Sequence, residues 1–381
     1  MKTSRIISLD GLRALSISMV LLAHGSYTMP GFISNSPIYV GASNGALGVK
    51  IFFVISGYLI TRLLLAEADR TGYIHIRKFY LRRFLRIFPV FYCYIAVVLI
   101  LKWFFIPDIL SSYYPPLFAG LYLWNYQDFF NYPIIPTDKG YWFFGHCWSL
   151  SMEEQFYLLW PFIMSRYSRS TVSKICLVLI IGMPLLRAAY YVVYPGMHLQ
   201  LRMMLHTGGD AILMGCLGAL LETKLLQHRL TQWLLKNPVF VGLCVVMLFF
   251  ISPKLAIMYK GSYGMTIGMS LDNALILILL LWSVHVSSVV ATFLNNRWLV
   301  RLGMMSYSIY IWQQLFLTYQ LDGWATKFPQ NFIVVAGVAY LSYRLIEKPI
   351  LDRRQAIETW AQRQVMPQLD QLKRRVLYAE R

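Results

Sequence analysis

Apolar stretches long enough to cross a bilayer recur along almost the whole of this 381-residue chain, separated by short polar connections. A transmembrane helix needs about 20 predominantly apolar residues. Ten stretches meet or approach that length: 10–29, 45–65, 86–106, 148–165, 172–194, 204–222, 238–252, 269–290, 303–320 and 330–346. The pattern predicts an all-α fold, a polytopic membrane helix bundle of about ten transmembrane helices.

Residues 107–147 do not fit this series of spans. They are rich in aromatic residues and proline, and their apolar piece at 116–124 is too short to cross. Irregular backbone is tolerated at membrane depth only against protein or water, so we expect a re-entrant loop that caps a cavity. Its aromatic residues suit two roles equally, contact with the faces of sugars and anchoring at the membrane interface.

Basic residues are distributed unevenly between alternate connections. With the N-terminus inside, the cytoplasmic segments hold about 24 of the 35 Lys and Arg residues, and the outer connections hold about 5. The positive-inside rule therefore places both termini in the cytoplasm. We divide the chain into a membrane domain, 1–346, and a basic cytoplasmic tail, 347–381, which we expect to form a surface helix.

The composition narrows the class of protein further. Its 57% hydrophobic and 14% charged residues exclude an ordinary soluble protein. The net charge of +18 is explained by the excess of Lys and Arg in the cytoplasmic connections, which attracts the chain to anionic lipid headgroups. Nucleic-acid binding is therefore not needed to explain it. The five cysteines do not indicate a disulfide framework, and no His and Cys spacing is typical of a metal site.

Two ionisable residues interrupt the first apolar stretch. Arg13 and His24 are eleven positions apart, which places them on nearly the same helix face and roughly 16 Å apart along its axis. A titratable group inside a span is costly unless it faces a partner or a wet cavity, so this pair is a candidate functional site. The alternative is that Arg13 reaches the cytoplasmic interface and His24 bonds a neighbouring helix.

A second candidate cluster is the run WSLSMEEQFYLLWP at 148–161, which opens the fourth predicted span. Glu153 and Glu154 lie about one turn inside it, near the depth that His24 reaches from the other direction. A carboxylate facing His24 would fix its tautomer, so that the imidazole acts as a general base. Capping of the helix start is the alternative role for the acidic pair. Trp148, the first residue of the run, is a candidate for binding substrate.

The third cluster is basic and lies at the start of the third predicted span, in RKFYLRRFLRIFPVFY. Arg82 and Arg86 are four positions apart and Arg83 and Arg86 three, so Arg86 neighbours both on a helix. Arginine forks bind phosphate bidentately, which suits a cytosolic donor such as a coenzyme A ester. Ordinary positive-inside anchoring is the alternative.

Further acidic and histidine side chains fall in the outer halves of later spans. His206 and Asp210 are four positions apart in the sixth span, and Asp272 lies in the eighth. These side chains are candidates for lining an outer cavity and binding substrate. The alternative is a packed, hydrogen-bonded contact between helices.

Several ordered motifs together are similar to those of a known family. They are SLDGLRALSISMVLLAH with its Arg-x10-His spacing, LGVKIFFVISGYLITRLL, FYLRRFLRIFPVFY, WSLSMEEQFYLLWP, SYSIYIWQ and IEKP. In this order, across nearly the whole chain, they resemble the acyltransferase 3 family of integral-membrane O-acyltransferases. The resemblance implies a ten-helix domain of a bacterial inner membrane with no tightly bound cofactor. Such a domain passes an acyl group, often acetyl, from cytosolic acyl-CoA to a sugar hydroxyl of a surface polysaccharide, glycolipid or glycoside.

The resemblance also implies roles for residues already described. It implies that His24 is the catalytic base and that Arg13 lies on the donor path. Arg83 and Arg86 would contact the donor, and Glu153 and Glu154 match the family's acidic pair. Two positions depart from the family's pattern. Gln313 stands where many members have His, so no second catalytic His is expected there. Lys50 replaces a common acid, which leaves the acceptor contacts at that position open.

A transporter, flippase or acyl carrier without catalysis of its own is the rival class. Buried ionisable residues also mark ion and substrate pathways, and ten spans is an ordinary number for a transporter. The sequence has no repeated pair of broken helices and no similarity between its halves, which favours the enzyme.

Overall fold

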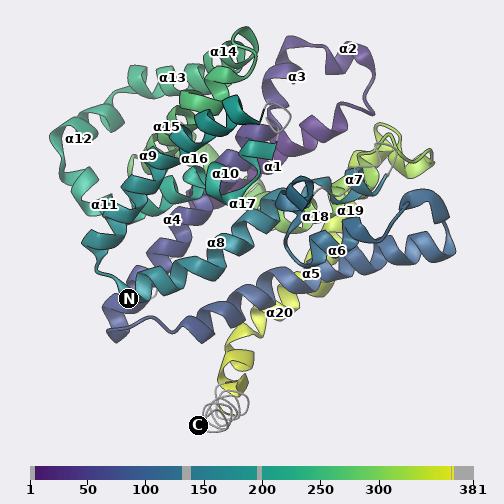
Figure 1. The fold of residues 1–381 in the computed structure, drawn as a ribbon, viewed down its shortest axis with the longest axis horizontal. Helices are drawn as coiled ribbons and strands as arrows, with labels where there is room; N and C mark the ends of the chain where they lie inside the picture. The colour runs from purple at the N-terminus through teal and green to yellow at the C-terminus, as the bar shows by residue number, and fades with distance from the viewer. Residues whose placement is uncertain (1–4, 131–138, 195–199, 362, 364–381) are drawn as a thin grey trace.

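The computed structural model describes residues 5–130, 139–194, 200–361 and 363. Within these ranges the chain forms helices and no β-strand, so the predicted all-α fold is confirmed there (Figure 1). Six segments are long and apolar enough to cross a membrane. They are α1 (Ile7–Gly25), α3 with α4 (Pro37–Ala42 and Gly45–Thr71), α5 (Ile76–Phe104), α9 (Arg169–Val193), α13 to α14 (Pro238–Met258) and η6 with α15 (Gly264–Gly268 and Met269–His285).

Four predicted spans lie in segments outside that group. They correspond to α8 (Cys147–Arg166), α10 with α11 (Leu205–Gly208 and Asp210–Gln227), α17 with α18 (Arg297–Met304 and Ser306–Phe316) and α19 (Gln330–Ser342). Ten crossings, the re-entrant loop and the cytoplasmic position of both termini therefore stay predictions. The other labelled α-helices are α2 (Gly31–Ser34), α6 (Tyr114–Gly120), α7 (Gly140–Gly145), α12 (Arg229–Lys236), α16 (Val289–Leu294) and α20 (Lys348–Asp352).

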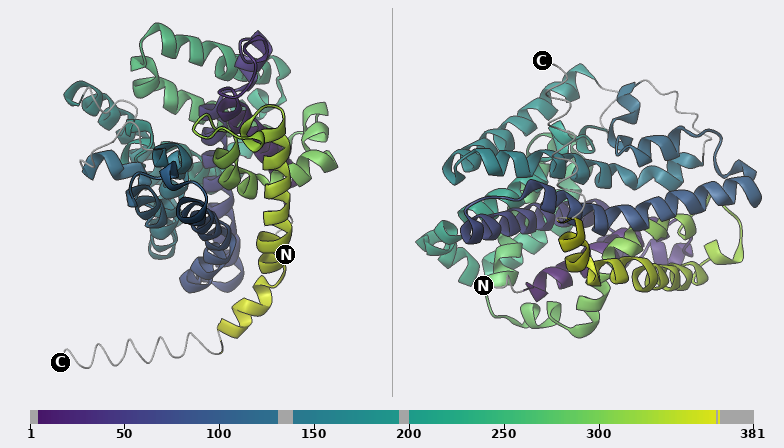
Figure 2. Two further views of the ribbon diagram at one scale, coloured as in Figure 1. Left: turned by 90° about the vertical axis from the view of Figure 1, so that its right-hand side faces the viewer. Right: turned by 90° about the horizontal axis from the view of Figure 1, so that it is seen from below.

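The bundle has two distinct ends. At one end, which we call the basic end, the start of α1 meets the backbone of α16 and α17 through Gly11 and Gly303. At the other end, the His24 end, the side chain of Phe332 on α19 packs against Gly25. A π-helical turn, η8 (Tyr343–Glu347), joins α19 to α20, and the three form a nearly continuous rod along one flank (Figure 2).

The predicted re-entrant region is only partly described. Its described parts include α6, η2 (Trp124–Phe130) and α7, whereas residues 131–138 lie outside the described ranges. Trp124 is buried, and the Gln155 side chain of α8 bonds to the carbonyl oxygen of Tyr122 (2.7 Å). These short helices therefore pack against the bundle.

Glycines bring α4 and α11 into close contact. A Cβ atom added at Gly57 would lie 1.9 Å from the carbonyl oxygen of Ile212, and one added at Gly215 would lie 2.0 Å from that of Val54. Small residues at such a crossing allow two backbones to approach closely. No side chain fits at either position unless the helices separate.

We therefore expect Gly57→Ala to lower the free energy of unfolding by about 1–3 kcal/mol or more, because the added methyl group overpacks the crossing. The measurement is thermal unfolding of the detergent-purified protein. Gly182→Ala on α9 is the matched control, since nothing lies within 4 Å of a Cβ atom there. Equal melting temperatures for the two variants would contradict this role for Gly57.

Candidate active site

A partly open cavity lies among α1, α4, α5, α8 and α18. It brings together predicted site residues from three separate motifs. Its polar lining consists of Arg13, Ser56, Arg83, Arg86, Ser149, Glu153, Tyr157, Ser306, Tyr307 and Tyr310. Val49, Phe52, Phe53, Ile87 and Leu150 supply the apolar walls.

Helical spacing explains which side chains reach the cavity. On α8, Ser149, Glu153 and Tyr157 follow one another at intervals of four, so they share a face. On α18, Tyr307 and Tyr310 are three apart and also share a face. The run around Glu153 therefore contributes a stripe of the cavity wall rather than one isolated acid.

The cavity carries more positive than negative charge. Its lining contains three arginines and a single carboxylate, that of Glu153. Arg13 Nη1 pairs with Asp10 Oδ1 (3.3 Å), but Arg83 lies over the ring of Tyr157, with Cζ 4.4 Å from its centroid. Among the described residues, neither Arg83 nor Arg86 forms an ion pair. Both guanidinium groups are therefore available to an anionic ligand.

The two adjacent glutamates have different surroundings. Glu153 lines the cavity near Ser56 and the three arginines, whereas Glu154 does not line it. The Oε1 atom of Glu154 is buried without a hydrogen-bond partner in the described part of the chain. The 100° step between neighbouring helix positions accounts for this separation.

His24 lies beyond the cavity, and its partner differs from the predicted one. Its Nδ1 atom is 3.3 Å from Oε1 of Gln313, and neither glutamate contacts the ring among the described residues. With the amide oxygen of Gln313 facing the ring, the hydrogen bond requires the tautomer with the proton on Nδ1, and in that tautomer Nε2 can act as a base. Gln313 is one turn beyond Tyr310, so one face of α18 leads from the cavity to His24.

Arg82 lies outside the lining and binds the tail. Its guanidinium makes two hydrogen bonds to Glu358, of 2.7 and 3.0 Å, in a helical segment at 354–361. Burial alone would raise the pKa of Glu358, but the hydrogen bonds and charge of Arg82 and its basic neighbours lower that pKa below its ordinary value. Glu358 is therefore ionised at neutral pH and holds the tail against α5.

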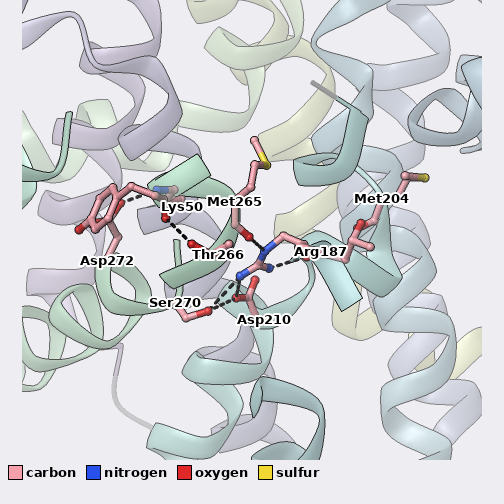
Figure 3. A network of polar contacts seen from close by, with 10 residues as sticks. Lys50, Arg187, Met204, Asp210, Met265, Thr266, Ser270 and Asp272 are labelled. Atoms are coloured by element: carbon pink, nitrogen blue, oxygen red, sulfur yellow. Dashed lines mark hydrogen bonds and ion pairs between the residues drawn. The ribbon is translucent and has the colours of Figure 1, made fainter. Parts of the chain in front are cut away.

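The predicted substrate-binding residues are not brought together. His206 stacks on Tyr126, whose hydroxyl is 3.0 Å from its Nδ1, and Trp148 packs edge-on against Phe53. Asp210 is fully buried and accepts hydrogen bonds from Arg187 and Ser270, both of 2.9 Å (Figure 3). None of the three predicted residues lines the cavity.

Figure 3 shows two ion pairs in this region. Arg187 is itself fully buried, donates to the backbone oxygens of Met265 and Thr207, and so ties α9 to η6 and α10. Nearby, Lys50 Nζ binds Asp272 Oδ2 at 2.6 Å, which links α4 to α15. Lys50, which stands where the resembled family commonly has an acid, thus pairs with an acid on another helix.

Sequence reasoning missed several residues. Arg187 is a charge inside an apolar stretch, and the criterion that singled out Arg13 would have found it. Tyr157 could have been found from its spacing of four from Glu153. His146 is 3% exposed and lies near the side chain of Gln314 and within electrostatic range of His24. Its proximity to His24 arises only from packing, so no spacing in the sequence could have revealed it.

An apolar helical bundle with an arginine-lined cavity defines an integral membrane protein that is suited to an anionic ligand. Comparison with known proteins agrees: the family described as "Acyltransferase domain" matches residues 6–344, and the chain belongs to it. The predicted family is therefore confirmed.

Curated relatives from two bacteria match most of this chain. It is 28% identical to the O-acetyltransferase OatA of Staphylococcus aureus, over 90% of this chain and 56% of that protein. The peptidoglycan O-acetyltransferase OatA of Listeria monocytogenes is also 28% identical, over 90% of this chain and 55% of the relative. The chain thus spans just over half the length of these relatives. No solved structure matches it significantly.

Proposed function

We propose that this protein is an O-acyltransferase of the bacterial inner membrane. It would move an acyl group, most simply acetyl, from cytosolic acyl-CoA to a sugar hydroxyl of a surface polysaccharide, glycolipid or glycoside. The observation that carries the proposal is that Arg13, Arg83, Arg86 and Glu153 line one cavity together. Its family and the relatives named O-acetyltransferases support the same reaction class.

The arginines are the proposed donor contacts. Arg83 and Arg86 lie on α5 near the basic end, which the positive-inside rule assigns to the cytosol. Free guanidinium groups bind phosphate oxygens bidentately. The eleven residues from Arg13 to His24 span roughly 16 Å, a length that suits an extended pantetheine arm.

In the direct form of the reaction, His24 Nε2 accepts the proton of the acceptor hydroxyl. The acceptor oxygen forms a C–O bond with the thioester carbonyl carbon, and the C–S bond then breaks. The coenzyme A sulfur leaves with the bonding electrons and takes up a proton. Gln313 orients the imidazole through Nδ1. Glu153 offsets part of the positive charge of the arginine-lined cavity.

We expect Arg83→Ala and Arg86→Ala each to raise the KM for acetyl-CoA by about 10- to 100-fold. A charge-assisted hydrogen bond contributes about 1.5–3 kcal/mol, and about 1.4 kcal/mol corresponds to a factor of ten. The measurement is the release of coenzyme A thiol by the purified chain. Arg229→Ala, at an exposed position on α12, is the control. An unchanged donor KM in both cavity variants would contradict the donor assignment.

The decisive experiment for the reaction is mass spectrometry of surface glycans and secreted glycosides from cells that produce the protein. An added acetyl mass, present only with the wild type, would support the enzyme and identify its acceptor. A transporter or carrier would instead move its cargo without cleaving acetyl-CoA. Thiol release by the purified chain therefore separates the two classes.

A further inference from the structure

Three aromatic side chains gather beside His24, outside the arginine-lined cavity. They are Tyr27, which follows α1, Trp142 on α7 and Tyr319, which follows α18. Ring centroids are 5.3 Å apart for Tyr27 and Trp142, 5.3 Å for Tyr27 and Tyr319, and 4.8 Å for Trp142 and Tyr319. We call this cluster the aromatic platform.

The platform is in contact with the proposed base. The ring centroids of Trp142 and His24 are 6.1 Å apart, in an edge-on arrangement. Trp142 is held in place because its Nε1 donates to the carbonyl oxygen of Gln314 (3.0 Å), next to the residue that binds His24. One turn of α18 thus positions both the histidine and the tryptophan.

The outer rings of the platform are open to a ligand. Tyr27 is 61% exposed and Tyr319 is 58% exposed, although each contacts the partly buried Trp142. Within the described residues, neither tyrosine hydroxyl forms a hydrogen bond to protein. The platform therefore offers apolar ring faces and two free hydroxyl groups beside Trp142, which itself contacts the proposed base.

We propose that the aromatic platform binds a pyranose ring of the acceptor and presents one of its hydroxyl groups to His24. A pyranose has an apolar face of C–H groups that packs on an aromatic ring, while its hydroxyl edge requires hydrogen-bond partners. This proposal rests on the proposed function, because it assigns the acceptor side of the same reaction. Membrane-interface anchoring is the competing role for exposed tyrosines.

Two observations favour the sugar over anchoring. The three rings come from distant parts of the chain yet form one cluster, whereas anchoring residues only need to lie at the same depth. The cluster also touches His24 directly. Along α18, the residues that line the arginine cavity precede Gln313, whereas Tyr319 follows it. Donor and acceptor would thus approach the histidine from different directions.

The test uses the full chain in detergent with acetyl-CoA and chitopentaose, an oligomer of N-acetylglucosamine. Binding of chitopentaose is measured by saturation-transfer NMR, and acetyl transfer is followed by mass spectrometry. For the double variant Tyr27→Ala/Tyr319→Ala, we expect the oligosaccharide Kd and KM to rise about tenfold or more, with the acetyl-CoA KM within about twofold. Tyr27→Phe/Tyr319→Phe keeps the rings and should stay within about threefold of the wild type.

Trp324→Ala is the matched control. Trp324 is 69% exposed, lies five positions beyond Tyr319 and is outside the platform. An unchanged oligosaccharide Kd in the double alanine variant, or no binding by the wild type, would overturn the platform. Failure of the proposed function is distinguishable, because it appears as absent acetyl-CoA cleavage in the wild-type protein whether or not the sugar binds.

Discussion

Replacing His24 by alanine is expected to reduce acetyl transfer by about 10²- to 10⁴-fold, the range for loss of a positioned general base. The fall should appear in kcat, with the acetyl-CoA KM little changed, because His24 does not line the arginine cavity. Initial rates of coenzyme A release at varied donor concentration would measure both constants.

His228→Ala is the control for the loss of an imidazole. His228 is exposed in the connection between α11 and α12, far in sequence from the cavity residues. We expect this variant to keep wild-type rates. Wild-type activity in His24→Ala at matched expression would remove His24 from the mechanism.

The largest expected effect on stability comes from the Arg187–Asp210 pair. Both side chains are fully buried, with 2.9 Å between Nη2 and Oδ2. Breaking a buried pair leaves an uncompensated charge and costs about 3–5 kcal/mol. Arg187→Met and Asp210→Leu should each lower the free energy of unfolding by this amount, measured by thermal or denaturant unfolding in detergent.

The double variant Arg187→Met/Asp210→Leu should recover more than half of that loss, because no buried charge remains. Asp322→Leu is a surface control. Its pairing with Lys327 is highly exposed, and removing such a pair changes stability by less than about 1 kcal/mol. If the double variant lost the sum of the two single effects, the charges would not be coupled.

The helices were predictable because apolar length is a local property of the sequence. Each of the ten predicted spans falls on a described helical segment, although only six segments have the length and composition of a span. The convergence of Arg13, Arg83, Arg86 and Glu153 agrees with the motifs that singled them out. Side chains at three- and four-residue spacing on known helices could be placed on faces before any packing was seen.

Contacts between distant elements could not be predicted in the same way. No local pattern pairs His24 with Gln313, 289 positions away, and a glutamate was expected instead. Likewise, the four-residue spacing of His206 and Asp210 suggested one shared site. In the structure, however, Asp210 bonds to Arg187 and His206 bonds to Tyr126. The pairing of such a side chain depends on how each helix is rotated about its axis relative to its neighbours. Hydrophobic periodicity does not determine that rotation in a bundle whose helices are apolar on most faces.

The glycine crossings have a consequence for motion within the bundle. Where α4 meets α11 at Gly57 and Gly215, and α1 meets α17 at Gly303, the backbones lie so close that no side chain fits between them. The α5 and α8 side of the arginine cavity is instead built from long side chains, such as Arg83 stacked on Tyr157, which can change rotamer while the helices stay in place. Such rotamer changes can widen the cavity while the closely packed glycine crossings keep their arrangement.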